Sequence, residues 1–252
     1  MIEIKKLNKS FSDKQVLKNI NLKIEDGKVL GLIGINGAGK STLLRLISGV
    51  YKANSGNIFI ENQEVYENEK IKKDIFFLPD EPYYSMNTTP KSLKDIYKTL
   101  YKFDEEKYLY YINLFKLPLN KPMNKFSKGM KRQVFISLAL SIKPKYLLLD
   151  EAFDGLDPLA RLTVKRALVE LIDEKKTTII IASHSLRELE DICDYYALLD
   201  KQTISSSGDI QDSLNKYHKY QMAFENSYAK EDFDIDFISY SQDGRVIKVV
   251  SE

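Results

Sequence analysis

The chain has 252 residues, of which 43% are hydrophobic and 29% are charged, and this composition excludes a disordered or fibrous protein. Its 38 basic and 36 acidic residues nearly cancel, so we expect no general attraction to nucleic acid and no nucleic-acid partner. A single cysteine, Cys193, excludes a disulfide framework and favours a reducing cytoplasm, and no apolar run approaches the roughly 18 residues that cross a bilayer. If the protein acts at a membrane, another subunit must cross it.

The first elements predict a sheet followed by a strand, loop and helix. Residues 2–8 alternate apolar and charged side chains, and residues 16–24 follow before an Asp26-Gly27 turn, which predicts a small antiparallel sheet. Residues 29–33 form a short apolar run typical of a buried parallel strand. After a glycine-rich break, residues 41–49 have leucines at helical spacing.

Helical patterns then dominate until strands return. Residues 85–141 predict an inserted helical subdomain. Strand patterns at 146–149 and 177–182 flank a predicted helix at 158–173, which indicates parallel pairing through a crossover. Residues 195–199 predict one more strand.

The last segment of the chain differs from the rest. Residues 237–240 and 246–250 flank Asp243-Gly244, a hairpin turn signal. We expect an α/β domain over residues 1–210 and a small C-terminal β extension over 211–252. The hairpin could serve regulation, protection of a sheet edge or contact within a dimer, and we favour the dimer contact.

A phosphate-binding loop is predicted between the strand at 29–33 and the following helix. Residues 34–41 read Gly-Ile-Asn-Gly-Ala-Gly-Lys-Ser and fit the pattern G-x-x-x-x-G-K-[ST]. Backbone N–H groups would surround phosphate oxygens, Lys40 would add a point charge, and the Ser41 hydroxyl would bind Mg²⁺. An ordinary glycine-rich turn is the alternative. The predicted nucleotide contacts are Gly34, Asn36, Gly37, Ala38, Gly39, Lys40, Ser41 and Thr42.

Two adjacent carboxylates follow the apolar strand at 146–149. In open α/β sheets ligands gather beyond the carboxyl ends of the strands, so Asp150 and Glu151 can reach the phosphate loop. We expect Asp150 to hold Mg²⁺ and Glu151 to orient and polarise the attacking water. The alternative is that both carboxylates only cap the next segment.

With these two elements, residues 1–210 resemble the nucleotide-binding subunits of ABC transporters. Residues 126–130, Phe-Ser-Lys-Gly-Met, stand where the family has its Leu-Ser-Gly-Gly-Gln signature. Residues 155–158, Gly-Leu-Asp-Pro, resemble the D-loop, and His184 follows a strand as the switch histidine does. The resemblance implies a P-loop NTPase fold of the ABC ATPase type, with an N-terminal antiparallel β subdomain and an inserted α-helical subdomain, that uses ATP and Mg²⁺.

The resemblance also assigns roles to single residues. It implies that Phe11 stacks on adenine and that His184 contacts the γ-phosphate during catalysis with Lys40 and Glu151. Ser127 and the backbone of Gly129 would contact the γ-phosphate of ATP bound to a second subunit. From the residue types alone, a phenylalanine such as Phe11 lies more often in the core, a lone histidine such as His184 is usually structural, and Ser127 could be only a helix N-cap.

The chain departs from the family pattern at several positions. Lys128 and Met130 replace a glycine and a glutamine of the signature, and we favour Lys128 pointing to solvent rather than toward phosphate. Asp80 stands where the family has a glutamine that reaches Mg²⁺. Asp80 could still ligate Mg²⁺, which prefers oxygen donors, but an ionised carboxylate donates no hydrogen bond and brings negative charge toward a triphosphate.

The resemblance implies a transporter subunit that acts in pairs. Two nucleotide-binding subunits, identical or related, would trap two ATP molecules and drive an integral membrane permease from the cytoplasmic face of the membrane. Tyr83, Tyr84 and Met86 could contact the permease or pack the subdomain core. The variant signature is typical of exporters of drugs, peptides or bacteriocins, and a soluble ATPase such as one for cluster assembly is the alternative.

Overall fold

The computed structural model describes residues 1–212, 218–224, 233 and 239–251. The chain forms two compact units, Met1–Ser207 and Gly208–Glu252, which are described separately. All the predicted site residues lie in the first unit.

An antiparallel sheet begins the first unit. Its order is β2-β1-β4-β5, and β1 pairs antiparallel with both β2 and β4. Ile2, Ile4 and Leu7 are buried along β1 and the residues between them are more exposed, as predicted; a register shift between Ile4 and Leu7, where Lys6 has a φ of 47°, returns Leu7 to the buried face. The strands are β1 (Ile2–Phe11), β2 (Lys14–Ile24), β4 (Ser55–Ile60) and β5 (Gln63–Glu64).

A second sheet holds the phosphate loop. Its order is β10-β9-β3-β8-β7-β6, and the pairings from β9 through β6 are parallel. Parallel strands end at the same edge of a sheet, so the segments after β3, β6, β7 and β8 meet there. The strands are β3 (Val29–Ile33), β6 (Ile75–Leu78), β7 (Tyr146–Asp150), β8 (Thr178–Ser183), β9 (Tyr195–Asp200) and β10 (Thr203–Asp209).

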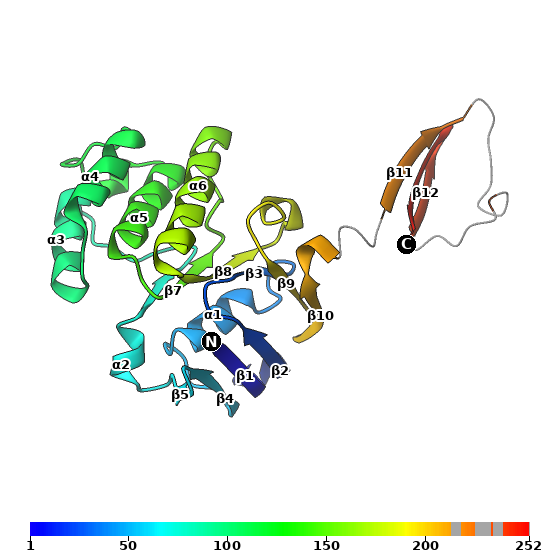
Figure 1. Cartoon of the computed structure of the whole chain (residues 1–252), viewed down its shortest axis with the longest axis horizontal. Coiled ribbons are helices and arrows are strands. Elements are labelled where there is room, and N and C mark those ends of the chain that lie inside the picture. Colours follow the sequence, from blue (N-terminus) through cyan, green and yellow to red (C-terminus); the bar gives the residue numbers. More distant parts are fainter. Residues whose placement is uncertain (213–217, 225–232, 234–238, 252) are drawn as a thin grey trace. The chain divides into compact units, whose positions relative to one another are not determined.

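Helices cover the sheet and build the inserted subdomain. In Figure 1, α3, α4 and α5 lie together, with α6 beside α5. Side chains cap several helices: Thr89 caps α3, Asp104 caps α4 and Asp157 caps α6. None of the helices among the described residues has the length and apolarity to cross a membrane. The helices are α1 (Lys40–Ile47), α2 (Glu69–Lys72), α3 (Pro90–Leu100), α4 (Glu105–Leu114), α5 (Lys128–Ile142) and α6 (Pro158–Lys175), with 3-10 turns η1 (Met123–Lys125) and η2 (Leu186–Glu188).

The second unit contains a three-stranded antiparallel sheet. It consists of β11 (His218–Ala223), β12 (Ser239–Asp243) and β13 (Val246–Ser251), with β13 in the middle. β12 and β13 form a hairpin in which Asp243 pairs with Val246, and Gly244 has the left-handed φ of 58° that such a turn requires. Residues 237 and 238 of the predicted strand lie outside the described residues.

Candidate nucleotide site

The phosphate loop leaves the carboxyl end of β3 and runs directly into α1. Gly37 and Gly39 have left-handed φ angles of 82° and 109°, so both positions favour glycine. A Cβ atom on Gly39 would also lie 3.1 Å from the carbonyl oxygen of Val16. The loop opens on a cavity of about 360 Å³. The cavity is lined by Val16, Asn36, Gly37, Gly39, Lys40, Ser41, Thr42, Asp80 and Glu151.

Lys40 is the first residue of α1, and its side chain reaches back to the phosphate loop. The residue is only 5% exposed. Its Nζ donates hydrogen bonds to the carbonyl oxygens of Gly34 at 2.7 Å and Ile35 at 3.3 Å. Nζ also lies 3.4 Å from Oε1 of Glu151. The ammonium group therefore stabilises the conformation of the loop and already faces the Glu151 carboxylate. The same cation can bind the negatively charged oxygens of a phosphate group.

Glu151 connects the loop with His184. Its backbone N–H donates to the carbonyl of Ala182 at 2.9 Å, which ties the end of β7 to β8. Its φ is 48°, a left-handed value that costs a non-glycine residue about 1–3 kcal/mol and occurs often at active sites. Oε2 lies 3.0 Å from Nδ1 of His184, whose side chain is 53% exposed directly after β8. The structure thus brings the three predicted catalytic residues together.

Asp150 fits a magnesium site together with Ser41. Its side chain is 1% exposed, and neither carboxylate oxygen has a hydrogen-bond partner within the part of the chain that the structure describes. Burial raises the pKa of Asp150, the Ser41 hydroxyl lowers it, and the charges of Glu151 and Asp80 raise it further. A buried, unpaired carboxylate beside a hydroxyl is suited to a small divalent cation that keeps phosphate oxygens among its ligands.

Asp80 lines the same cavity but faces cations. Oδ1 of Asp80 lies 2.7 Å from a guanidinium nitrogen of Arg132 and 3.4 Å from Nζ of Lys128. Lys128 also donates to Asp154 at 2.6 Å. The Lys128 side chain is half-exposed, in agreement with the favoured prediction that it faces solvent, but its Nζ also binds two carboxylates that the sequence did not predict.

The signature segment begins α5. Ser127 is the N-cap of the helix, and its Oγ accepts a hydrogen bond from the Met130 N–H at 3.2 Å. Gly129 is buried, and a Cβ atom there would lie 2.3 Å from the carbonyl oxygen of Gly155. The capping bond explains Ser127 locally, so its contact with a second subunit's ATP stays a prediction.

Phe11 lies at the end of β1 and is 41% exposed. Its ring contacts Tyr51 edge-on at 5.4 Å and lies 4.8 Å from Nζ of Lys9. Phe11 is thus accessible and outside the core, and adenine stacking on it stays a prediction.

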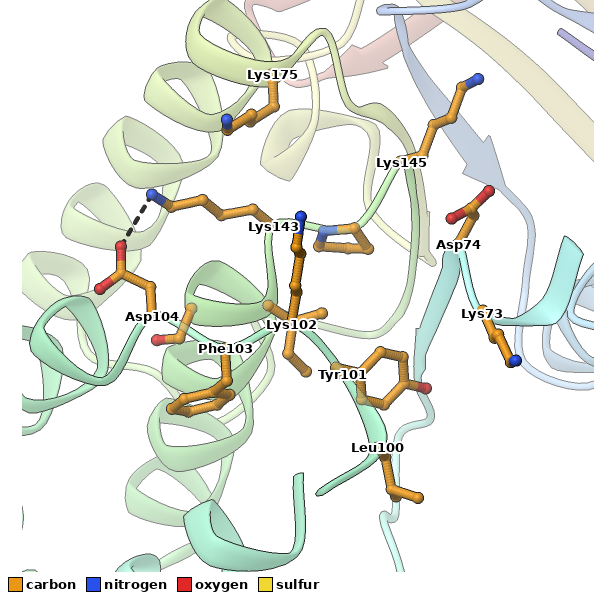
Figure 2. A pocket seen from close by; sticks show the side chains of 13 residues that line it. Lys73, Asp74, Leu100, Tyr101, Lys102, Phe103, Asp104, Lys143, Lys145 and Lys175 are labelled. Atoms are coloured by element: carbon orange, nitrogen blue, oxygen red, sulfur yellow. Dashed lines mark hydrogen bonds and ion pairs between the residues drawn. The ribbon is translucent and has the colours of Figure 1, made fainter. Parts of the chain in front are cut away.

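A larger hollow of about 610 Å³ lies elsewhere (Figure 2). Asp74 precedes β6 and Lys145 precedes β7, so this hollow lies at the amino ends of the parallel strands, opposite the phosphate loop. Figure 2 shows the hydrogen bond from Lys143 to Asp104, at 3.0 Å, on one side of the hollow. The hollow has none of the predicted phosphate-binding residues and is not the nucleotide site.

The fold and the phosphate loop define a nucleotide-binding protein of the P-loop class. A family model described as ABC transporter matches residues 17–154, and one described as an AAA domain matches residues 119–190. The ABC transporter ATP-binding protein YtrB of Bacillus subtilis (strain 168) is 36% identical over 227 residues, which cover 89% of this chain and 77% of YtrB. The chain belongs to the ABC transporter family, and it binds and hydrolyses ATP.

Other relatives differ in the transported substrate that their names state, and one of these names also states import. The methionine import ATP-binding protein MetN of Clostridium tetani (strain Massachusetts / E88) is 34% identical, with 84% of this chain and 70% of MetN covered. The lantibiotic transport ATP-binding protein SrtF of Streptococcus pyogenes is 32% identical, with 89% of this chain and 99% of SrtF covered. A solved structure of the ATP binding subunit of an ABC transporter superposes with a TM-score of 0.76 at 27% identity, over 84% of this chain and 91% of that one.

Two residues at or near the site were not predicted from the sequence. Val16 lines the cavity from β2, and its signal was only that it follows Phe11 on an adjacent strand. Arg132 is 3% exposed and binds Asp80. The sequence carried no clear signal for this burial, because Arg132 lies between Lys131 and Gln133 and the apolar run of α5 begins only after them.

Proposed function

We propose that the chain powers a membrane transporter, most readily an exporter of a peptide, bacteriocin or drug, through a separate permease subunit. The observation that carries the ATP-driven step is the convergence of Lys40, Glu151 and His184 beside the phosphate loop. The resemblance of the variant signature to exporters favours export, and the similarity to SrtF, whose name states lantibiotic transport and which is covered over 99% of its length, supports a peptide substrate. The relation to MetN makes import the second candidate.

Different residues around the cavity would bind different parts of the ATP molecule. The loop N–H groups and the N-terminus of α1 hold the phosphates, and Lys40 exchanges its carbonyl partners for phosphate oxygens. Ser41 and Asp150 hold Mg²⁺, which supplies positive charge to the β- and γ-phosphates. Phe11 would stack on the adenine.

Hydrolysis depends on Glu151 and His184. Once phosphate replaces Glu151 as the partner of Lys40, the Glu151 carboxylate is available to orient and polarise a water molecule for attack. His184, exposed after β8, then contacts the γ-phosphate. The reaction therefore uses positioning and charge, with no covalent intermediate.

A second nucleotide-binding subunit would complete each site. Ser127 and the Gly129 backbone lie at the start of α5, where the helix N-terminus favours an anion. We propose that they bind the γ-phosphate of ATP held by the partner. An identical chain and a related chain both satisfy this role, because nothing in Ser127 or Gly129 distinguishes the two.

The permease would dock beside the segment after β6. Tyr83 is 94% exposed and Met86 is 76% exposed, the two highest values for large hydrophobic side chains among the described residues. Tyr84 instead packs near Phe135, with ring centroids 6.3 Å apart. We therefore assign Tyr83 and Met86 to a permease on the cytoplasmic face of the membrane, and Tyr84 to the subdomain interior.

Co-purification from membranes tests the partner. A tagged full-length chain should retain an integral membrane protein in detergent, and a double variant Tyr83→Ser, Met86→Ser should lose it while ATP binding persists. A soluble scaffold protein in place of a membrane protein would favour the cluster-assembly alternative. Direction is tested with inverted vesicles, in which added ATP should drive accumulation of an exporter substrate; absence of uptake together with ATP-driven import into right-side-out vesicles would overturn export.

A further inference from the structure

We propose that Asp80 is a positioning residue that, with Arg132, Lys128 and Asp154, locks the start of α5 to the nucleotide cavity, and that it is not a magnesium ligand. The inference deepens the proposed function, because it rests on the start of α5 completing a second subunit's ATP site. It concerns two positions, Asp80 and Lys128, at which this chain departs from the pattern of its family.

The pair of Asp80 and Arg132 is the buried end of this network. The Arg132 side chain is 2% exposed, and Asp80 is its only ion-pair partner among the described residues. Arg132 also donates to the carbonyl oxygens of Asp80 at 2.8 Å and Pro79 at 2.9 Å. A buried guanidinium needs a paired anion, so the Asp80 carboxylate is committed to α5.

Lys128 forms the exposed end. It occupies the first position of α5, where a cation opposes the helix dipole. Its Nζ lies 2.6 Å from Asp154 and 3.4 Å from Asp80, and these carboxylates offset that cost. The hydrogen bond to Asp154 raises the pKa of Lys128, and the same bond lowers the pKa of Asp154.

The backbone keeps the same segments in register. A Cβ atom on Gly129 would lie 2.3 Å from the carbonyl oxygen of Gly155, so the start of α5 and the loop after β7 are in direct contact. Glu151 begins that loop. The network therefore joins the segment after β6, the signature at the start of α5, and the loop that carries the water-polarising carboxylate.

Charge explains why this arrangement suits a phosphate site. The two cations of the network offset its two anions and so limit the negative potential that Asp80 adds to the cavity it lines, although the Asp80 charge still contributes to the raised pKa of Asp150. A magnesium ligand at Asp80 would have to leave Arg132 without an anion in a buried position. The paired geometry thus favours positioning over metal binding.

A double-mutant cycle tests the proposal with the full-length chain in its ATP-hydrolysing assembly. Asp80→Asn and Lys128→Met should each lower kcat about fivefold, and the double variant should lose no more than the more impaired single variant, as for residues that act as a unit. The KM for ATP and the Mg²⁺ concentration for half-maximal turnover should stay near the wild-type values. Lys128→Arg, which keeps the charge, should retain most of the activity.

Matched controls remove neighbouring charges. Glu81 and Lys125 are exposed and have no ion pair among the described residues, so Glu81→Gln and Lys125→Met should leave kcat unchanged. If Asp80→Asn unfolds the protein, the double-mutant cycle can be repeated on the exposed ion pair of Lys128 and Asp154, with the variants Lys128→Met and Asp154→Asn.

Two results would overturn the inference. One is a raised Mg²⁺ requirement in Asp80→Asn that Lys128→Met does not share, which would make Asp80 a metal ligand. The other is losses that add in the double variant, which would make the two residues independent. The ATP-dependent pairing of subunits is measured in parallel by gel filtration. If wild-type chains do not pair in the presence of ATP, that result contradicts the proposed function itself, independently of the role of Asp80.

Discussion

Nδ1 of His184 lies 3.0 Å from Oε2 of Glu151, and this contact joins the predicted water-polarising carboxylate to the predicted γ-phosphate contact. A hydrogen bond to the carboxylate requires the proton on Nδ1, which leaves Nε2 of a neutral ring as an acceptor. Phosphate oxygens need a donor, so the contact between His184 and Glu151 must rearrange when ATP binds. His184→Ala should therefore lower kcat about 100-fold, while ATP binding, measured by fluorescence, stays intact.

Replacing Glu151 separates binding from hydrolysis. Glu151→Gln keeps the size of the side chain but removes the charge that polarises water, so kcat should fall by about 10² to 10⁴. Affinity for ATP should not fall, since Lys40 loses a competing anion, and the ATP-bound dimer should persist in gel filtration. Turnover equal to that of the control Glu81→Gln would refute this role.

Lys40 should be essential for tight nucleotide binding. Lys40→Ala removes the central cation and the two hydrogen bonds that shape the loop at Gly34 and Ile35. Calorimetric titration should show that ATP affinity falls by about 10²-fold or more, as expected when a charged hydrogen bond to phosphate is lost in a buried site. Normal affinity in this variant, with Lys125→Ala as the control, would place the nucleotide elsewhere.

Asp150 links stability to pH. Burial raises its pKa in the folded state, so the unfolded chain loses this proton first as pH rises. The contribution of Asp150 to the free energy of unfolding is therefore most favourable below the pKa of the unfolded chain. That contribution is lost as the pH rises from the unfolded pKa through the higher folded pKa. Asp150→Asn should raise the unfolding temperature of the ligand-free protein at pH 7 and abolish Mg²⁺-dependent turnover. The gain should shrink when unfolding is followed at pH 5, and a gain that instead grew toward low pH would contradict burial as its cause.

Gly129 tests the contact between α5 and the loop after β7. Gly129→Ala would place a methyl group 2.3 Å from the Gly155 carbonyl oxygen, so a backbone segment must shift. We expect a loss of about 1–3 kcal/mol in the free energy of unfolding and weaker ATP-dependent pairing of subunits. If chemical denaturation gives an unchanged free energy of unfolding for this variant, the turn at Gly155 can move to accommodate the methyl group without cost, and the close contact does not stabilise the fold.

The elements around the phosphate loop could be predicted because their signals are local. The runs that became β3, β7 and β8 are apolar with little interruption, and each ends at a glycine, a carboxylate or a histidine that marks the site. Strand β4 and the two-residue strand β5 gave no such signal, because their residues mix small, polar and apolar side chains. Strand β4 forms because β1 offers it a pairing edge, and β5 forms because β4 offers the next edge.

The contacts between distant segments could not be predicted. The hydrogen bond from Arg132 to Asp80 joins residues 52 positions apart, and no periodicity carries that information. Sequence identified both Asp80 and Lys128 as departures from a family pattern, but treated them separately. Only the packing of α5 beside the end of β6 shows that one departure compensates the other.

The ion pair between Lys40 and Glu151 also restrains the chemistry of the subunit. An arriving phosphate would therefore compete with Glu151 for the same cation. On the proposed roles, one exchange of partners at Lys40 would both seat the nucleotide and free the Glu151 carboxylate, so the two events would be coupled through a single side chain.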